Sequence, residues 1–213
     1  MRRQETRARM HRRVAYGITA AVVAIGLSIG IWVLVRQTSS PDAAGGVVGA
    51  RGQRGMPPWQ LPSDPESAAK AAGLQVSKME GTATHFHSHL DITVNGQPLA
   101  VPSSIGVDPR TGAMSELHTH DERGVLHVES PTKDGVYTLG QVFAEWDVRL
   151  DGDGVGGLNN TKTDSLRAYV DGKLVEGNPA KIELGERRQI SLIYGPRNAT
   201  DAPASSFAFD PDE

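Results

Sequence analysis

A stretch of twenty-two uncharged residues near the N-terminus constrains this chain more than any other feature. It runs from Val14 to Val35, reads VAYGITAAVVAIGLSIGIWVLV and is bounded by Arg13 and Arg36. At a rise of about 1.5 Å per residue, a helix of this length crosses a hydrocarbon core of about 30 Å. The sequence therefore predicts a transmembrane helix over residues 14–35, with the lipid bilayer as a partner.

The charges before this segment predict its orientation. Residues 1–13 contain six arginines and one acid, Glu5, and basic residues of this kind are retained in the cytoplasm. A cleaved signal peptide is the competing interpretation, but the apolar stretch exceeds the about 7 to 15 residues of a signal core, and RQTSSPD offers no small-residue cleavage site. We expect a single-pass protein of the cell membrane, with residues 1–13 cytoplasmic and the C-terminal part extracytoplasmic.

The remainder divides into a linker, one domain and a tail. Residues 36–63 are rich in Ser, Gly and Pro without a regular period and are predicted to form a flexible linker. Residues 64–195 contain the periodic segments expected of a folded domain. Residues 196–213 lack such a pattern and are predicted to be disordered.

Composition excludes two classes of protein. The formal net charge is −3 and the positive charge is concentrated at the N-terminus, so the folded part lacks the basic face that nucleic-acid binding needs. Cysteine is absent, which removes disulfides, thiolate metal ligands and cysteine nucleophiles. Any metal chemistry must therefore use nitrogen and oxygen ligands.

Local signals within residues 64–195 predict two helices. Asp64 is a suitable N-cap for a short helix that begins at Pro65 and stops at Gly73. Thr138 and Gln141 fit a capping box, and the residues that follow place an apolar stripe on one side of a helix. That stripe consists of Leu139, Val142, Phe143 and Trp146.

Turn signals predict hairpins around these helices. Asn95-Gly96 should pair Val94 with Gln97, Ile92 with Leu99 and Leu90 with Val101. Asp121 to Gly124 and Asp171-Gly172 mark two further hairpins, and QISLIYG is typical of a closing strand. The fold class is α+β, a small and mostly antiparallel sheet of hairpins with one packed helix, and the order of hairpin, helix and hairpin is compatible with a β-grasp-like arrangement.

The domain is rich in histidine over a short range. Six of the seven histidines fall between residues 85 and 127, and they are His85, His87, His89, His118, His120 and His127. Because side chains alternate along a strand, the first three should project from one face, opposite the apolar residues of the same strand.

The register of the second hairpin decides whether the other histidines meet. A two- or four-residue turn pairs His120 with Val125 and His118 with His127, about 5 Å apart at Cβ, and a three-residue turn breaks this pairing. With the even turn, Glu116 and Glu129 join the same face.

Imidazoles beside carboxylates are typical ligands of transition metals, whereas Mg and Ca prefer oxygen. The available oxygens belong to Asp91, Asp121, Glu116 and Glu129, as ligands or as partners that orient the histidines. We expect a copper or zinc ion as cofactor, in one site or two. A metal-free hydrogen-bonded or pH-responsive cluster is the alternative.

Three segments resemble a known group of proteins. HFHSHLDITVNGQPLAVPSSIGVD, LHTHDERGVLHVESP and YTLGQVFAEW are similar to segments of bacterial membrane-anchored extracytoplasmic proteins, of an actinobacterial type, that have no established activity. The resemblance covers about residues 73–195 and implies a cell-envelope location. Such relatives often carry cysteines that this chain lacks.

Three functions are compatible with these observations. The first is a binding protein that captures, buffers or delivers copper or zinc. The second is a hydrolase or hydratase in which three histidines hold zinc beside a glutamate base. The third is a metal-free interaction module of the cell envelope. The histidine pattern favours the first.

Overall fold

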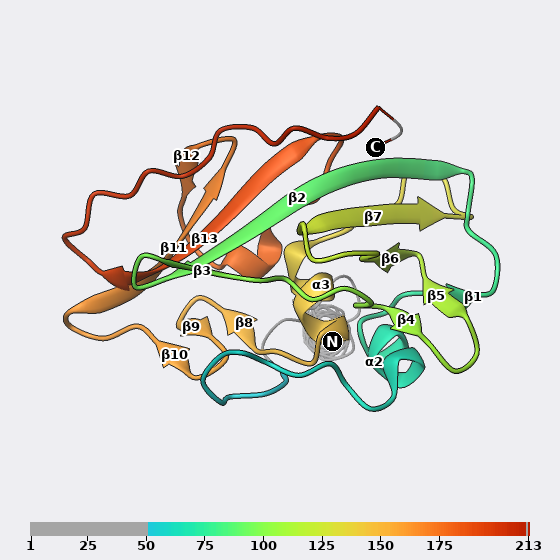
Figure 1. The fold of residues 1–213 in the computed structure, drawn as a ribbon, viewed down its shortest axis with the longest axis horizontal. Coiled ribbons are helices and arrows are strands. Elements are labelled where there is room, and N and C mark those ends of the chain that lie inside the picture. The colour runs from blue at the N-terminus through green and yellow to red at the C-terminus, as the bar shows by residue number, and fades with distance from the viewer. Residues whose placement is uncertain (1–50, 212) are drawn as a thin grey trace, which may run out of the picture. The chain divides into compact units, whose positions relative to one another are not determined.

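A mixed sheet with α-helices on one side organises the described part of the chain (Figure 1). The computed structural model describes residues 51–211 and 213. The predicted cytoplasmic segment, the transmembrane anchor and residues 36–50 of the linker lie outside the described residues. Among the described helices, none has the length and apolar character needed to cross a bilayer.

The main sheet has seven strands in the order β12-β11-β13-β2-β7-β6, with β3 paired to β2. All pairs are antiparallel except β13 and β2, which run parallel at the centre of the sheet. The strands are β2 (Thr84–Val94), β3 (Gln97–Leu99), β6 (Leu117–His118), β7 (Val125–Ser130), β11 (Asp164–Val170), β12 (Lys173–Val175) and β13 (Arg188–Pro196).

Two small antiparallel sheets and three short helices complete the domain, which confirms the α+β class. The sheets have the orders β1-β5-β4 and β10-β9-β8. Their strands are β1 (Val76–Ser77), β4 (Val107–Asp108), β5 (Ala113–Ser115), β8 (Leu150–Asp151), β9 (Gly154–Val155) and β10 (Leu158–Asn159). The helices are α2 (Pro65–Ala71), α3 (Leu139–Glu145) and the 3-10 helix η3 (Pro179–Lys181).

The predicted helix ends are confirmed. Asp64 caps α2 through a hydrogen bond from the Ser67 amide at 3.1 Å. In α3, the amide of Thr138 donates to Gln141 Oε1 at 2.9 Å, which is one half of the capping box. The apolar stripe of α3 is buried against the sheet residues Leu90 and Ile92 in one continuous core.

Two of the predicted tight turns are also confirmed. Asn95-Gly96 and Asp171-Gly172 adopt positive φ at both positions, 51° and 78° in the first pair and 50° and 76° in the second. This conformation matches the twist of the flanking strands. The first hairpin is shorter than predicted, because β3 ends at Leu99 and the expected pairing of Leu90 with Val101 is absent from its register.

The second hairpin has the predicted register in one of its two pairs. His118 pairs with His127 between β6 and β7. The predicted pairing of His120 with Val125 is absent, since β6 ends at His118 and its register with β7 stops there. The reason is that the chain leaves the ladder at Thr119, whose amide donates to the carbonyl of Ile105.

Part of the predicted linker is packed. Gln53 forms an isolated bridge with Val148. Trp59 is buried in the core, and its ring meets that of Trp146 edge to face at 5.5 Å between centroids. Burial of a large aromatic side chain outweighs the tendency of Gly- and Pro-rich sequence to remain flexible, so residues 53–59 belong to the domain.

The segment after β13 is packed as well, contrary to the predicted disorder. It runs along the long strands without helix or strand of its own (Figure 1). Asp201 accepts hydrogen bonds from Arg167 at 2.8 Å and from Tyr169 at 2.6 Å, and Phe207 stacks on His89 at 3.7 Å between ring centroids. These contacts compensate for the absence of regular structure.

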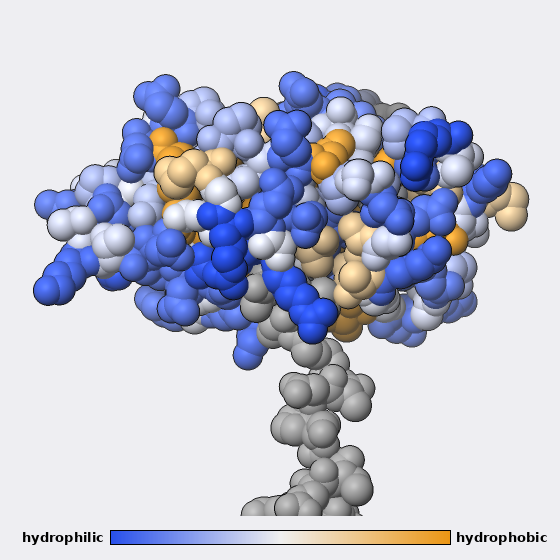
Figure 2. All heavy atoms as spheres, turned by 90° about the horizontal axis from the view of Figure 1, so that it is seen from below, coloured by the Kyte–Doolittle hydropathy of each residue, from blue (hydrophilic) through white to orange (hydrophobic). Residues whose placement is uncertain are grey.

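The surface seen from below is mostly hydrophilic, and its apolar residues form small separate patches (Figure 2). The large hydrophobic side chains that are exposed in the described part come from different segments. They are Met56, Leu61, Met79, Val136 and Leu174. On this side, the described residues therefore present no broad apolar surface to a partner.

Candidate metal centre

Three adjacent strands bring four of the predicted metal-ligating histidines to one face of the sheet. β2 pairs with β7 so that His85 lies opposite Glu129 and His87 lies opposite His127. β6 adds His118 opposite the same His127. The other face of β2 carries Leu90 and Ile92 and packs on the core, so alternation along the strand separates the histidines from the apolar layer.

One group of four residues has the geometry of a metal site. His118, His120, His127 and Glu129 each offer a ligand atom, and these atoms all lie within 4.8 Å of one another. The Nε2 atoms of His118 and His120 are 3.2 Å apart. Two nitrogens bound to one tetrahedral zinc ion at about 2.0–2.1 Å would be separated by about 3.3 Å. The observed spacing is therefore close to that of a ligand pair.

A backbone hydrogen bond determines which ring nitrogen of His118 carries the proton. Its Nδ1 donates a hydrogen bond to the carbonyl oxygen of Ser115 at 2.8 Å. Because a carbonyl can only accept, the proton lies on Nδ1 in the neutral ring. The Nε2 lone pair faces Nε2 of His120 at 3.2 Å, where a metal ion could replace the hydrogen bond between the two rings. The hydrogen bond to Ser115 is of the kind that orients the histidine ligands of metal sites.

Glu129 stands between two groups of imidazoles. Its Oε1 lies 3.6 Å from His85 Nε2 and 3.9 Å from His127 Nδ1. Its Oε2 is buried and has no hydrogen-bond partner among the described residues. A buried carboxylate oxygen without a partner is costly, unless a proton or a cation is bound to it.

A second group shares this carboxylate. His85, His87 and Glu129 also offer ligand atoms within 4.8 Å of one another. The rings of His85 and His87 meet edge to face at 4.9 Å between centroids. His87 is buried and His85 is exposed.

Burial sets the protonation of the histidines in the metal-free site. Desolvation and, to a smaller extent, neighbouring imidazoles lower the pKa of His118 to about 4 and that of His127 to about 3. Desolvation likewise lowers the pKa of His87. At neutral pH these three rings are uncharged, which is the form that binds a metal ion.

The carboxylate of the site shifts in the opposite direction. Desolvation raises the pKa of Glu129, and the nearby Glu80 raises it further. A bound cation would reverse both effects, because it would replace the lost hydration and offset the repulsion between the two acids.

The side chains of His89 and Asp91 form hydrogen bonds outside the two metal-ligand groups. The two ring nitrogens of His89 each lie 2.7 Å from an oxygen, Gln189 Oε1 on one side and the Arg123 carbonyl on the other. Asp91 accepts hydrogen bonds from Gln189 at 2.5 Å and from Ser191 at 2.9 Å. The predicted third member of the H-x-H-x-H series is thus engaged in a hydrogen-bond network rather than in the metal group.

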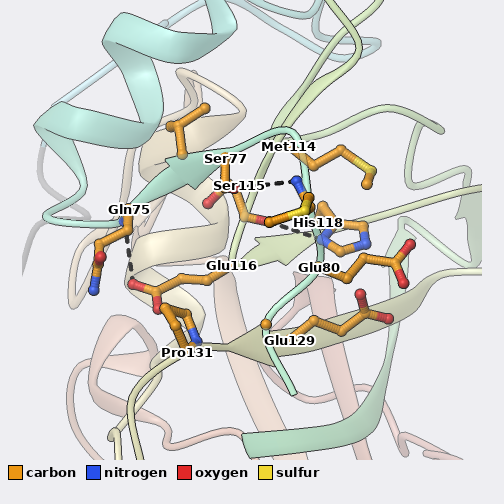
Figure 3. Close-up of a pocket in the computed structure, with 12 residues that line it drawn as sticks. Gln75, Ser77, Glu80, Met114, Ser115, Glu116, His118, Glu129 and Pro131 are labelled. Atoms are coloured by element: carbon orange, nitrogen blue, oxygen red, sulfur yellow. Dashed lines mark hydrogen bonds between the residues drawn. The ribbon is translucent and has the colours of Figure 1, made fainter. Parts of the chain in front are cut away.

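Asp121 and Glu116 are also outside the two groups. Asp121 accepts a hydrogen bond from the Arg123 guanidinium at 2.7 Å. Glu116 accepts hydrogen bonds from the hydroxyls of Ser130 at 2.6 Å and Tyr137 at 3.0 Å. Figure 3 shows its side chain directed away from His118. Glu116 does not share a face with His118 as predicted, because it lies in a bend between β5 and β6, where the alternation of side chains along a strand is interrupted.

A cavity of about 380 Å³ adjoins the group of four and is lined by both His118 and Glu129. Glu80 lines it as well, and its carboxylate lies on the same side as that of Glu129 (Figure 3). Gly81 explains this proximity, because a Cβ there would lie 2.1 Å from the carbonyl carbon of Ser130. Only glycine lets this segment pass so close to β7.

Two acids were not predicted from the sequence. Glu80 precedes β2 in an exposed segment, and only the close approach at Gly81 brings it to the site. Glu145 is fully buried on α3, and desolvation raises its pKa well above the ordinary value. Its position near the end of an amphipathic helix gives no sequence signal for such burial.

Comparison with protein-family models, curated proteins and solved structures finds no match to this chain. The histidine and glutamate groups therefore carry the functional argument alone. They could hold a metal ion.

Proposed function

We propose that this protein binds a transition metal ion, zinc or copper, and that it captures, buffers or delivers this ion outside the cytoplasm. The proposed ligands are His118, His120, His127 and Glu129. The observation that carries the proposal is the buried, unpartnered Oε2 of Glu129 beside converging imidazole nitrogens. Leaving such an oxygen without a proton or a cation is energetically unfavourable.

The choice of metal follows from the donor atoms. Three imidazole nitrogens and one carboxylate oxygen suit Zn(II) or Cu(II), whereas an all-oxygen shell would suit Mg or Ca. His120 is the exposed member of the group, while the other three ligands are buried. An ion could therefore reach the site, and leave it, on the side of His120, as capture and delivery require.

Calorimetric titration of the full chain in detergent micelles with Zn(II) and Cu(II) tests this function. The His120→Gln variant changes an exposed ligand and should weaken binding at least about tenfold. The matched control is His89→Gln, in the same face of the sheet, and it should bind like the wild type. Absence of tight binding by the wild type, or equal binding by the His120→Gln variant, would contradict the proposal.

A zinc enzyme is the second candidate, and the cavity beside His118 and Glu129 favours it. A zinc ion with an open position can activate water for hydrolysis or hydration. Zinc-dependent hydrolysis of an activated ester, lost on Glu129→Gln substitution, would support this candidate. Metal binding without such activity would contradict the enzyme and support the binding function.

Location and classification are inferred from further observations. Residues 14–35 and the preceding arginines support a membrane anchor with an extracytoplasmic domain. Protease added to spheroplasts should therefore digest the domain, and protection would contradict this orientation. The order of hairpin, helix and hairpin, with the parallel pair of β2 and β13 at the centre, supports a β-grasp-like classification. The segments that begin with HFHSHLD, LHTHD and YTLGQ support relationship to the bacterial group they resemble.

A further inference from the structure

We infer that the site holds two metal ions rather than one, bridged by the carboxylate of Glu129. The second ion would bind His85 and His87, and this inference rests on the proposed binding of the first ion by the neighbouring group.

The strand register places the second pair of ligands beside the first site. His85 lies directly opposite Glu129, and His87 directly opposite His127, in the pairing of β2 with β7. Side chains directly opposite one another have Cβ atoms about 5 Å apart. The rings of His87 and His127 are accordingly 4.5 Å apart between centroids. The two groups of ligands therefore adjoin each other along one face.

Glu129 is the one residue that belongs to both groups of ligands. Its Oε1 lies near nitrogens of both, 3.6 Å from His85 and 3.9 Å from His127. Its Oε2 is buried without a partner. Carboxylates commonly bridge paired ions that lie about 3.5–4 Å apart.

The ring of His87 meets the rings of His85 and His127 edge to face. It is 4% exposed, and no hydrogen bond from its ring is found among the described residues. His118, in contrast, is oriented by Ser115. The nitrogens of His87 are therefore available to a metal ion.

Charge favours a second cation at this position. Glu213 and Glu186 favour a positive charge at His87, whereas Arg187 opposes it. Glu80 lies beside Glu129 at the edge of the cavity (Figure 3). These acids would offset part of the repulsion between two divalent ions. His85 is exposed, so the second site would be open to solvent and weaker than the first.

Metal stoichiometry tests the inference directly. The full chain in detergent micelles is dialysed against buffered Zn(II), and bound zinc is measured by mass spectrometry. We expect two zinc ions per chain in the wild type and one in the His85→Gln variant. His89→Gln, a change four residues further along β2, should keep both ions. Because His85 is exposed, its replacement should leave the fold intact, which circular dichroism checks.

The outcomes separate this inference from the proposed function. One zinc ion in the wild type, unchanged by His85→Gln, would overturn the paired site and leave the first site standing. No zinc in the wild type would overturn both. A second readout is paramagnetic resonance after loading with two equivalents of Cu(II), where ions so close should give a half-field signal. Two isolated Cu(II) signals would overturn the shared carboxylate.

Discussion

Acidification of the metal-free protein should reduce its stability through the buried histidines. His118 is 1% exposed and its pKa falls to about 4, because desolvation opposes its charged form. In the unfolded chain its pKa should be about 6.5. Between these two values the unfolded state binds more protons than the folded state, so stability falls as pH drops from about 6.5 to about 4.

The size of this effect follows from the two pKa values of His118. Each pKa unit corresponds to 1.36 kcal/mol, and a difference of about 2.5 units gives a loss of about 3 kcal/mol over this range. His127 should add to the loss, since its pKa is lowered too. Glu145 acts in the opposite direction, because its pKa is raised and its neutral form is favoured as pH falls.

Urea unfolding with a chelator present, at several values between pH 7 and pH 4, measures the effect. Tryptophan fluorescence is a suitable signal, since Trp59 and Trp146 are buried. The His118→Gln variant isolates the contribution of this ring, because the other titrating groups are common to both proteins. We expect its unfolding free energy to fall about 3 kcal/mol less than that of the wild type. Equal pH dependence in the two proteins would refute the reasoning.

Three further outcomes are expected. Glu145→Gln should raise the unfolding free energy at pH 7, because Glu145 is ionised in the unfolded chain and neutral in the folded one. This gain in stability should shrink as the pH falls towards 4.5. A variant less stable than the wild type at pH 7 would contradict a neutral buried acid. Zinc at 100 times its dissociation constant should stabilise the wild type by about 2.7 kcal/mol in thermal unfolding, and a His120→Gln variant should gain less at the same zinc concentration. Phe207→Ala should remove the stack on His89 and speed proteolysis of the C-terminal segment. The number of zinc ions bound should stay the same. Unchanged proteolysis would show that this stack does not hold the segment.

Local features of the fold could be predicted from the sequence, because each depends on a few adjacent residues. The turn at Asn95-Gly96 needs positive φ, which these two residue types tolerate. The cap at Asp64 needs only an acceptor three residues before a free amide. The pairing of His118 with His127 could be predicted by assuming that the turn between them has an even number of residues.

The assembly of the site could not be predicted in the same way. The pairing of β2 with β7 joins segments that no short turn connects, and it alone places His85 beside Glu129. His89 has the same strand parity as His85, yet Gln189 from β13 occupies one of its nitrogens. Glu116 has the parity of His118, but a bend turns it towards Tyr137. In each case a contact distant in sequence decides the outcome.

X-ray absorption at the zinc edge of the loaded full-length protein tests the metal site most directly. The proposed ligands predict nitrogen and oxygen neighbours at about 2.0–2.1 Å, together with the outer-shell scattering of imidazole rings. This imidazole scattering should decrease in the His120→Gln variant. A zinc shell of oxygen atoms alone, or a spectrum unchanged by that substitution, would contradict the assignment of these histidines as metal ligands.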